Sequence, residues 1–427
     1  MSLHEPVSAA EGVPFFTPKQ ILRAGTAVVP QPDGKEIPKL FQPLKVRGFS
    51  LQNRIGLAPM CQYSANAKFE ATPWHVVHYG EIIKRGPGLS YTEATSVSPE
   101  GGLSPQDLAI FNDEQAKKLK DVVDFVHSQN QHIGIQLAHG GRKASGLPLY
   151  EHLEKVADES VGGWPEKVVG PSPIPHRPQG SLPTPKELSV SDIKRIVKEF
   201  GSAAKRAVEI SGFDIIQIHG AHGYLINNFY SPLSNKRTDD YGGSFENRIR
   251  LLLEIIDEVR ANIPEDFPLS LRISASDNSV DDVASWTIED SVKLAPLVIA
   301  RGVDIIAISS GGNDSSARAR TPFDSVHADF AKAVKSAVGD TGLVSCAGSL
   351  KTATAANKYI EDGAFDIAEF GRAFLKNPAL VNQFADELGV RINNPRQLEW
   401  AFHTDRNQMI EAITEAAHKV AALELNK

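Results

Sequence analysis

Ile215-Ile-Gln-Ile-His-Gly-Ala-His-Gly-Tyr224 is the stretch that decides the fold and points to the chemistry. Strand residues alternate between two faces, so its isoleucines can share a buried side while the chain leaves the strand at His219. The small residues that follow let His219, His222 and Tyr224 converge on one small volume. Two imidazoles beside a phenol indicate a site that binds an oxygen and delivers a proton.

The same pattern, a short apolar run that ends in polar or small residues, recurs along the chain. Eight such runs are predicted as buried parallel strands: Ile55–Ala58, Leu89–Ala94, His132–Ala138, Asp214–His219, Leu269–Ile273, Asp304–Ile308, Gly342–Cys346 and Asp366–Phe370. Helical periodicity lies between them, most clearly over Ile193–Ala207 and Ile249–Val259, with shorter examples at Lys117–His127 and Ala328–Val338. Eight strands alternating with helices favour an α/β fold of the (β/α)8 TIM barrel type over an open doubly wound sheet.

Segments that lack this strand–helix alternation define the expected domain organisation. Residues 1–37, punctuated by prolines, are predicted to be an N-terminal extended arm, and residues 38–390 the barrel itself. Residues 147–190 are rich in Pro and Gly and follow the third strand, which is typical of a lid or capping insertion on the catalytic face. Residues 223–247 are predicted as a second long loop. Residues 391–427 form a C-terminal segment and a possible subunit interface.

Composition limits the kinds of partner that the chain is expected to bind and the compartment in which it is expected to work. The 427 residues carry a net charge of −7, so the chain has no basic footprint for nucleic acid or for an anionic membrane. No segment approaches the ~20 apolar residues that span a bilayer, and residues 1–13 lack the apolar core of a secretory signal. Only two cysteines, Cys61 and Cys346, are present, which argues against a disulfide framework or a four-cysteine cluster. We expect a cytoplasmic protein with a small-molecule substrate.

The strand ends carry the candidate cofactor site, because a barrel places its active site at the carboxyl ends of its strands. The last two ends are Gly-containing turns followed by Arg372, the usual barrel position for a phosphate. Gln136 and Arg272 are polar groups suited to hydrogen-bonding a heterocycle. No Rossmann, Walker A, G-x-S-x-G or H-E-x-x-H motif occurs. A phosphorylated ring cofactor such as FMN therefore fits better than a dinucleotide held by a Rossmann fold.

Two longer motifs resemble a known family. Asn53-Arg-Ile-Gly-Leu-Ala-Pro-Met-Cys-Gln-Tyr63 and the run from His219 to Arg248, which includes Ser-Pro-Leu-Ser-Asn-Lys-Arg-Thr-Asp-Asp-Tyr-Gly-Gly-Ser, are similar to the old yellow enzyme family of FMN-dependent ene-reductases (NADPH dehydrogenases). The resemblance covers roughly residues 38–400. The cysteine in the first motif is typical of the thermophilic-like (class III) subgroup.

The resemblance implies a role for each matched residue. The cofactor-binding residues would be Ala58, Pro59, Met60, Cys61, Ala94, Gln136, Arg272, Ala347, Gly348, Gly371 and Arg372. Tyr63 would shape the substrate pocket, His219 and His222 would bind the substrate carbonyl, and Tyr224 would be the proton donor. NADPH or NADH would reduce FMN, which would pass hydride to the β-carbon of an α,β-unsaturated carbonyl compound while Tyr224 protonates the α-carbon.

Other interpretations of these residues remain open. The histidines could be metal ligands in a barrel hydrolase or lyase, or satisfied polar core residues, and the chain could be a catalytically idle flavin-binding protein. Arg272 could pair with Asp304 instead of a cofactor, and Gly311-Gly312 could be only a turn. Cys346 is expected to be inert core.

One departure from the family pattern concerns the subunit contact. Bacterial members of the subgroup end with an arginine that reaches the neighbouring subunit's pocket, and here Trp400 stands in its place. We expect a homo-oligomer, a dimer or tetramer, whose shared active sites either are absent or use an aromatic contact. Residues 403–427 are predicted to form a further helix that could pack at the interface.

Overall fold

The computed structural model describes residues 8–151, 155–177, 181–280, 283–317 and 325–402. Its centre is a closed barrel of eight parallel strands in the order β3-β4-β5-β8-β9-β10-β11-β12. The strands are Ile55–Leu57 (β3), Leu89–Ser96 (β4), Gly134–Ala138 (β5), Ile215–Gly220 (β8), Leu269–Ser274 (β9), Ile305–Ser309 (β10), Leu343–Ala347 (β11) and Ile367–Phe370 (β12). All eight predicted strands form, and the (β/α)8 prediction is confirmed.

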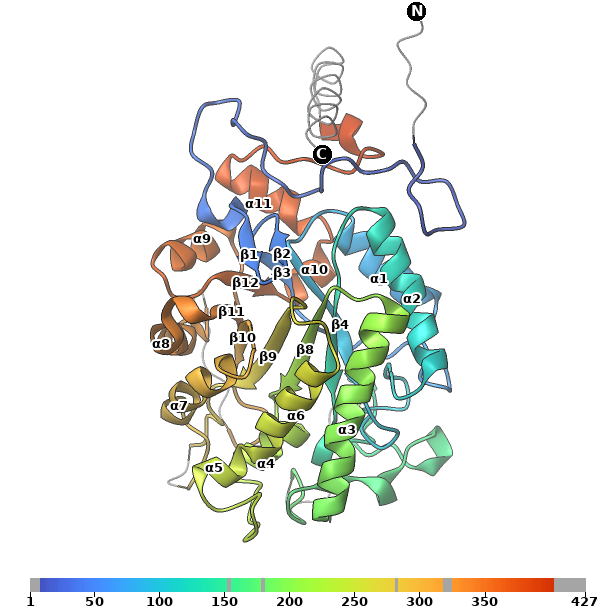
Figure 1. Ribbon diagram of the computed structural model, residues 1–427, viewed down its shortest axis with the longest axis vertical. Coiled ribbons are helices and arrows are strands. Elements are labelled where there is room, and N and C mark those ends of the chain that lie inside the picture. Colours follow the sequence, from blue (N-terminus) through green and yellow to red (C-terminus); the bar gives the residue numbers. More distant parts are fainter. Residues whose placement is uncertain (1–7, 152–154, 178–180, 281–282, 318–324, 403–427) are drawn as a thin grey trace, which may run out of the picture.

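Helices surround the barrel (Figure 1). They are Pro73–Ile83 (α1), Asp113–Ser128 (α2), Val190–Arg206 (α3), Leu225–Tyr230 (α4), Phe245–Arg248 (α5), Arg250–Ala261 (α6), Ile288–Ile299 (α7), Ala328–Val338 (α8), Ala353–Glu361 (α9), Arg372–Lys376 (α10) and Leu380–Leu388 (α11). Helix α3 shows why the sequence folds this way. The Ser189 side chain caps its start by accepting from the Asp192 backbone N–H, and Ile193, Ile196 and Phe200 bury the face that the helix turns to the core.

One end of the barrel is closed by a hairpin. Strands β1 (Leu44–Val46) and β2 (Phe49–Leu51) pair antiparallel. Val46 and Leu51 form a separate apolar cluster with the first residues of several barrel strands, such as Leu89 and Ile215. The hairpin therefore covers the amino ends of the strands, at the top of Figure 1, and leaves the carboxyl ends open at the bottom.

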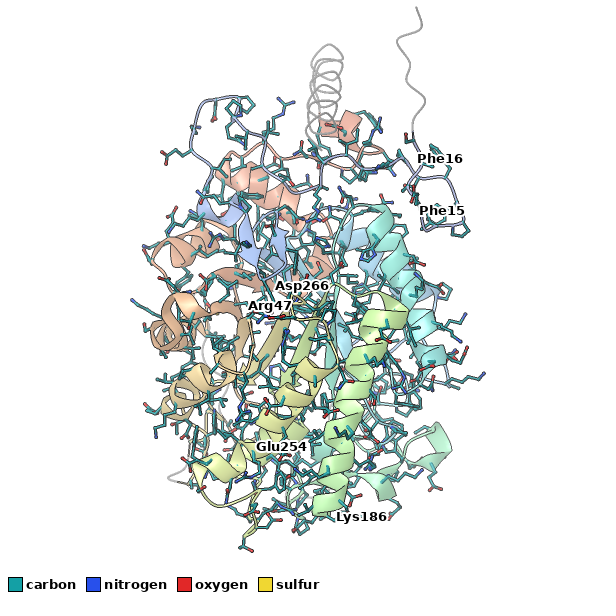
Figure 2. The ribbon with its side chains drawn as sticks, viewed as in Figure 1. Phe15, Phe16, Arg47, Lys186, Glu254 and Asp266 are labelled. Carbon is teal, nitrogen blue, oxygen red and sulfur yellow. The ribbon has the colours of Figure 1, made fainter. Side chains whose placement is uncertain are left out.

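The N-terminal arm is held at the closed end by the C-terminal segment. The backbone N–H groups of Gly25 and Val28 donate to the carbonyls of Asn393 and Arg391, and the Asn393 N–H donates to Thr26. Figure 2 shows Phe15 and Phe16 of the arm at the outer edge of the molecule. Sequence patterning did not predict this pairing, because it joins residues that lie more than 350 positions apart.

Both long loops contain regular elements that were not predicted. Residues 147–190 contain the short strands β6 (Val169–Gly170) and β7 (Lys186–Glu187), which pair with each other. Lys186 lies at the open end of the barrel (Figure 2). The second loop, 223–247, contains α4, whose residues are all buried. The predicted long connection is therefore present, and it holds a short helix of about one and a half turns that was not predicted.

Candidate functional site

The end of β8 brings the two histidines and the tyrosine of the opening stretch together. The ring centroids of His219 and Tyr224 are 5.0 Å apart, those of His219 and His222 are 5.1 Å apart, and those of His222 and Tyr224 are 6.3 Å apart. Gly223 makes the turn possible: its φ is +74°, and a Cβ there would lie 2.1 Å from the Gly312 carbonyl oxygen. The predicted convergence of these three side chains is therefore present in the structure.

The His219 ring is neutral and has a defined tautomer. Burial, with Arg272 and Lys143 nearby, holds the pKa of His219 well below its ordinary value. Its Nδ1 accepts the Ala221 backbone N–H at 3.4 Å, so Nε2 carries the proton. Burial and the same two cations also lower the pKa of His222. Each neutral ring has one N–H to donate: the Nε2–H of His219, and the Nδ1–H of His222 when its Nε2 accepts the Ser309 hydroxyl.

The Tyr224 phenol is held in its protonated form. Burial raises the pKa of Tyr224 well above its ordinary value, Cys61 and Asp107 raise it further, and Arg272 opposes them. Tyr224 thus lies within electrostatic reach of two predicted cofactor residues, Cys61 and Arg272. A phenol that keeps its proton at physiological pH can serve as a proton donor.

His222 is held by the two strands that follow β8. Its backbone N–H donates to Ser274 Oγ at 2.8 Å, and its Nε2 lies 2.6 Å from Ser309 Oγ. Ser274 in turn donates to the Gly311 carbonyl. His222 adopts a φ of +61°, which is uncommon for a residue other than glycine. Ser309 directly follows the predicted strand Asp304–Ile308.

Lys143 is a site residue that sequence analysis missed. It follows β5, and its Nζ donates to the carbonyls of His222 and Gly312 at 2.9 and 2.8 Å while lying 5.4 Å from the centre of the Tyr224 ring. The neighbouring Arg142 is buried and donates to Asn313 and to the insertion at Ile174. Two consecutive cations just beyond a predicted strand end could have been recognised from the sequence as candidate site residues.

The predicted cofactor residues line the open end of the barrel from several strands. Ala58 and Pro59 follow β3, and the Ala58 N–H donates to the Phe370 carbonyl of β12. Met60 packs against the core, and Cys61 follows it as a free thiol. Burial, Asp107 and Glu93 raise the pKa of the Cys61 thiol well above its ordinary value, while the Ala94 backbone lowers it. Cys61 is therefore a neutral thiol next to Ala94.

Gln136 and Arg272 lie in the barrel interior. Gln136 pairs in register with Ala94 on β4 and with Gln217 on β8, to whose side chain it donates at 2.6 Å. Arg272 pairs in register with His219. Among the described residues, the buried Arg272 Nε has no hydrogen-bond partner. An unpartnered guanidinium nitrogen fits a ring that offers carbonyl and nitrogen acceptors, as the flavin of FMN does.

The glycine turns after β11 and β12 fit a phosphate. Gly348 has a φ of +137°, and a Cβ there would lie 2.5 Å from His327 Nδ1, so only glycine fits. Ala347 is buried at the end of β11. Gly371 precedes α10 next to Met60, and Arg372, an exposed cation, begins that helix. Backbone N–H groups and one cation are the donors that a phosphate needs.

Tyr63 contacts the insertion. It has a φ of +50° and is half-buried, and its ring meets that of Tyr150 edge-on at a centroid distance of 6.0 Å. Burial is the main cause that raises the pKa of Tyr63, and Tyr224 contributes to the same shift. The insertion thus reaches the predicted substrate pocket through one exposed tyrosine.

The structure bears on several of the alternative interpretations that the sequence left open. Asp304 pairs with Arg47 at 2.8 Å and with Arg260 at 3.6 Å, so the alternative that it pairs with Arg272 is wrong. Gly311 and Gly312 both have positive φ and close the loop against His222. Cys346 is fully buried. Within the described ranges, no three His, Cys, Asp or Glu residues form a group that could hold a metal ion.

The described part of the C-terminal segment ends in exposed aromatic residues. Trp400 is 68% exposed and Phe402 is 47% exposed. The predicted helix at 403–427 lies outside the described residues. In the described part of the chain, no helix has both the length and the apolar character needed to cross a membrane.

Comparisons with known proteins agree with the site. The profile of the NADH:flavin oxidoreductase / NADH oxidase family matches residues 39–390. An NADH:flavin oxidoreductase of Gibberella zeae is 47% identical over 402 residues, 92% of this chain and 95% of that protein. An NADPH dehydrogenase of Geobacillus thermodenitrificans is 39% identical over 85% of this chain and 99% of that protein.

Solved structures share the barrel. Morphinone reductase is 26% identical with a TM-score of 0.67, over 84% of this chain and 91% of that one. This chain spans about half (52%) of 2-naphthoyl-CoA reductase, with a TM-score of 0.72 and 23% identity, a likeness that shows the fold alone. The extent of the family match and the identity to its members lead to one conclusion: the chain belongs to the NADH:flavin oxidoreductase / NADH oxidase family, that of the old yellow enzymes, and is an FMN-dependent oxidoreductase that uses NAD(P)H as its reductant.

Proposed function

We propose that this oxidoreductase reduces the activated C=C bond of α,β-unsaturated carbonyl compounds, in the manner of an ene-reductase. The observation that carries the proposal is the convergence of His219, His222 and Tyr224 at the end of β8, within electrostatic reach of Cys61 and Arg272. Two neutral donors and one phenol in one pocket match an acceptor oxygen and a carbon that needs a proton.

The cofactor would be held by residues of six barrel strands or their ends. Ala58 to Cys61 and Ala94 would lie along the flavin, Gln136 and Arg272 would bind its polar edge, and Ala347, Gly348, Gly371 and Arg372 would hold the phosphate. When bound, FMN supplies the two-electron chemistry by taking hydride from NAD(P)H and passing it to the substrate. Arg272 would stabilise the negative charge of the reduced ring, because it is a buried cation with an unpartnered nitrogen.

The substrate carbonyl would accept hydrogen bonds from His219 and His222. Each ring stays neutral because burial lowers its pKa, and His219 presents its Nε2–H. These donors withdraw electron density from the conjugated system and make the β-carbon electrophilic. Removing one preorganised donor of this kind costs roughly 3–4 kcal/mol of transition-state stabilisation in other enzymes.

Tyr224 would deliver the proton to the α-carbon. Its phenol is buried and keeps its proton, and Lys143 lies over its ring. Tyr63 would form the opposite wall of the pocket. Fixing the carbonyl on the histidines places the α-carbon next to the phenol, so orientation contributes to the rate as well as acidity.

Purified protein provides the test. We expect a yellow protein with flavin absorbance that NADPH or NADH bleaches under anaerobic conditions and that an enone such as 2-cyclohexenone recolours. A saturated ketone of the same ring size is the control and should leave the protein bleached. A protein that is bleached but not recoloured by any enone would contradict the proposal while leaving the flavin chemistry intact.

We further propose that the chain forms a dimer or tetramer in the cytoplasm. The exposed Trp400 and Phe402 support an aromatic contact between subunits, and the two free thiols suit a reducing compartment. Light scattering of the wild-type protein and of Trp400→Ser tests the contact. Equal oligomer masses for the two proteins would show that Trp400 is not needed for the contact between subunits.

A further inference from the structure

Glu93 is a buried carboxylate that the proposed reaction does not use. It lies in β4 next to Ala94, and its side chain has no exposed surface. Burying a carboxylate without donors is costly, so a fully buried one that persists has its oxygens occupied. Glu93 is also the one acid in the otherwise uncharged predicted strand Leu89–Ala94.

A β-bulge directs this side chain. Tyr91 pairs in register with Gly134, but Ala94 pairs with Gln136, so β4 contains one residue more than β5 over the same span. Such a bulge bends the strand and re-aims the side chains at that point. Ala94 keeps its place beside Gln136, and Glu93 turns toward the loop that carries Cys61.

The Glu93 carboxylate binds that loop directly. Its Oε2 accepts the backbone N–H of Gln62, the residue after Cys61, at 2.7 Å. Its Oε1 accepts the Tyr79 hydroxyl at 3.2 Å, and the same hydroxyl accepts the Glu93 backbone N–H at 2.8 Å. Tyr79 lies on α1 and is buried. Glu93 is thus fixed by a helix on one side and holds the Cys61 loop on the other.

His75 completes this arrangement. Its Nδ1 accepts the Thr72 backbone N–H at 3.0 Å, at the start of α1, so the proton of the neutral ring is on Nε2. That Nε2 lies 3.4 Å from Glu93 Oε1. Among the described residues, the Gln62 N–H and the Tyr79 hydroxyl donate hydrogen bonds to the carboxylate, and the His75 Nε2, which has no hydrogen-bond partner, lies close to it.

We propose that Glu93 is a positioning residue, whose carboxylate holds the Cys61–Gln62 loop in the place from which Cys61 faces the FMN site. The inference rests on the proposed position of Cys61 along the flavin and is independent of the substrate. The same carboxylate adds to the burial that keeps the pKa of the Cys61 thiol high, so the loop is held and the thiol stays neutral.

The test compares FMN affinity and Cys61 alkylation in the holoenzyme. Glu93→Leu fills the space and removes both acceptors. We expect its dissociation constant for FMN to rise at least tenfold and the rate of Cys61 alkylation by iodoacetamide at neutral pH, followed by peptide mass, to rise about tenfold. Glu93→Gln keeps one carbonyl acceptor for the Gln62 N–H and should restore most of both values, which a purely structural role would not predict.

A matched control separates this role from the loss of any buried acid. Asp277 also accepts one backbone N–H, that of Trp286, and one hydroxyl, that of Ser231. Asp277→Leu should lose stability as Glu93→Leu does, with unchanged FMN affinity and unchanged Cys61 alkylation. Cys346 serves as the internal reference for alkylation in every protein.

Defined outcomes overturn the inference. If Glu93→Leu does not fold, Tyr79→Phe loosens the same carboxylate and should move both readouts in the same direction by a smaller factor. A folded variant of either kind with wild-type FMN affinity and wild-type alkylation would show that Glu93 does not position the loop. If FMN does not protect Cys61 in the wild-type protein, the proposed position of Cys61 fails instead.

Discussion

His222 at the end of β8 and Ser309 at the end of β10 are joined side chain to side chain, with Nε2 2.6 Å from Oγ. The contact crosses β9, whose Ser274 accepts the His222 backbone N–H. The imidazole that is expected to hold the substrate is thus oriented by two neighbouring strands rather than by its own loop. Both serine hydroxyls contact His222, which has a positive φ.

We expect Ser309→Ala to weaken ligand binding without affecting the cofactor. Loss of one hydrogen bond of about 1 kcal/mol predicts a dissociation constant about fivefold higher for a carbonyl ligand. Absorbance titration of the bound flavin measures it. Ser310→Ala is the control, because Ser310 contacts Asn278 and His327 instead. Equal affinities in wild type and Ser309→Ala would show that the contact does not orient His222.

Tyr224→Phe should separate the two half-reactions. The ring and its packing remain, so bleaching of the flavin by NADPH should keep its wild-type rate. The enone-dependent step should slow by roughly 100- to 10,000-fold, the usual contribution of a general acid. Anaerobic stopped-flow absorbance measures each step by itself. An unchanged enone step would assign the proton to another donor, such as Tyr63 or water.

The eight strands were predictable because buried parallel strands have apolar runs that end in Gly, Pro or polar residues. The same rule identified Gln136, His219 and Arg272, since it places reactive groups at the carboxyl ends. That rule did not identify Glu93 or Lys143, for different reasons. The first depends on a bulge that shifts the register by one residue, and the second on a loop that folds back across β8 and β10.

The pH dependence of stability should report on His139. Burial lowers the pKa of His139 to about 4, while its Nδ1 accepts the Gly141 N–H. As pH falls from 6.5 to 4, the unfolded chain takes up a proton at this position and the folded chain does not. This group therefore lowers the free energy of unfolding over that window, by about 3 kcal/mol.

Asp107 has the opposite effect on the free energy of unfolding as pH falls. Burial raises the pKa of Asp107 to about 7, so the folded state binds the proton before the unfolded state does. The difference between wild type and His139→Gln isolates the histidine. We expect urea midpoints of the variant to lack the decrease contributed by His139 between pH 6.5 and pH 4. Parallel curves for the two proteins over that range would show that His139 is not buried in its neutral form.

Tyr150 offers the sharpest test of the insertion. The chain just before it is fixed by the Gly146–Val156 bridge and by the Leu147 N–H bond to Lys155. The Tyr150 ring contacts that of Tyr63 edge-on, although the residue is 67% exposed. If the insertion shapes the pocket, this ring is the part that an incoming substrate meets first.

We expect Tyr150→Ala to change KM by about three- to tenfold for enones with a bulky ring substituent, because an aromatic contact of ~0.5–1.5 kcal/mol is lost. Small acyclic enones should keep their wild-type KM. FMN content should not change, since the ring that Tyr150 contacts, that of Tyr63, is not among the proposed cofactor residues. Val161→Ala, an exposed substitution in the same insertion, is the control. Loss of flavin in Tyr150→Ala, or an equal change in KM for every enone, would give the insertion a structural role in place of a substrate-shaping one.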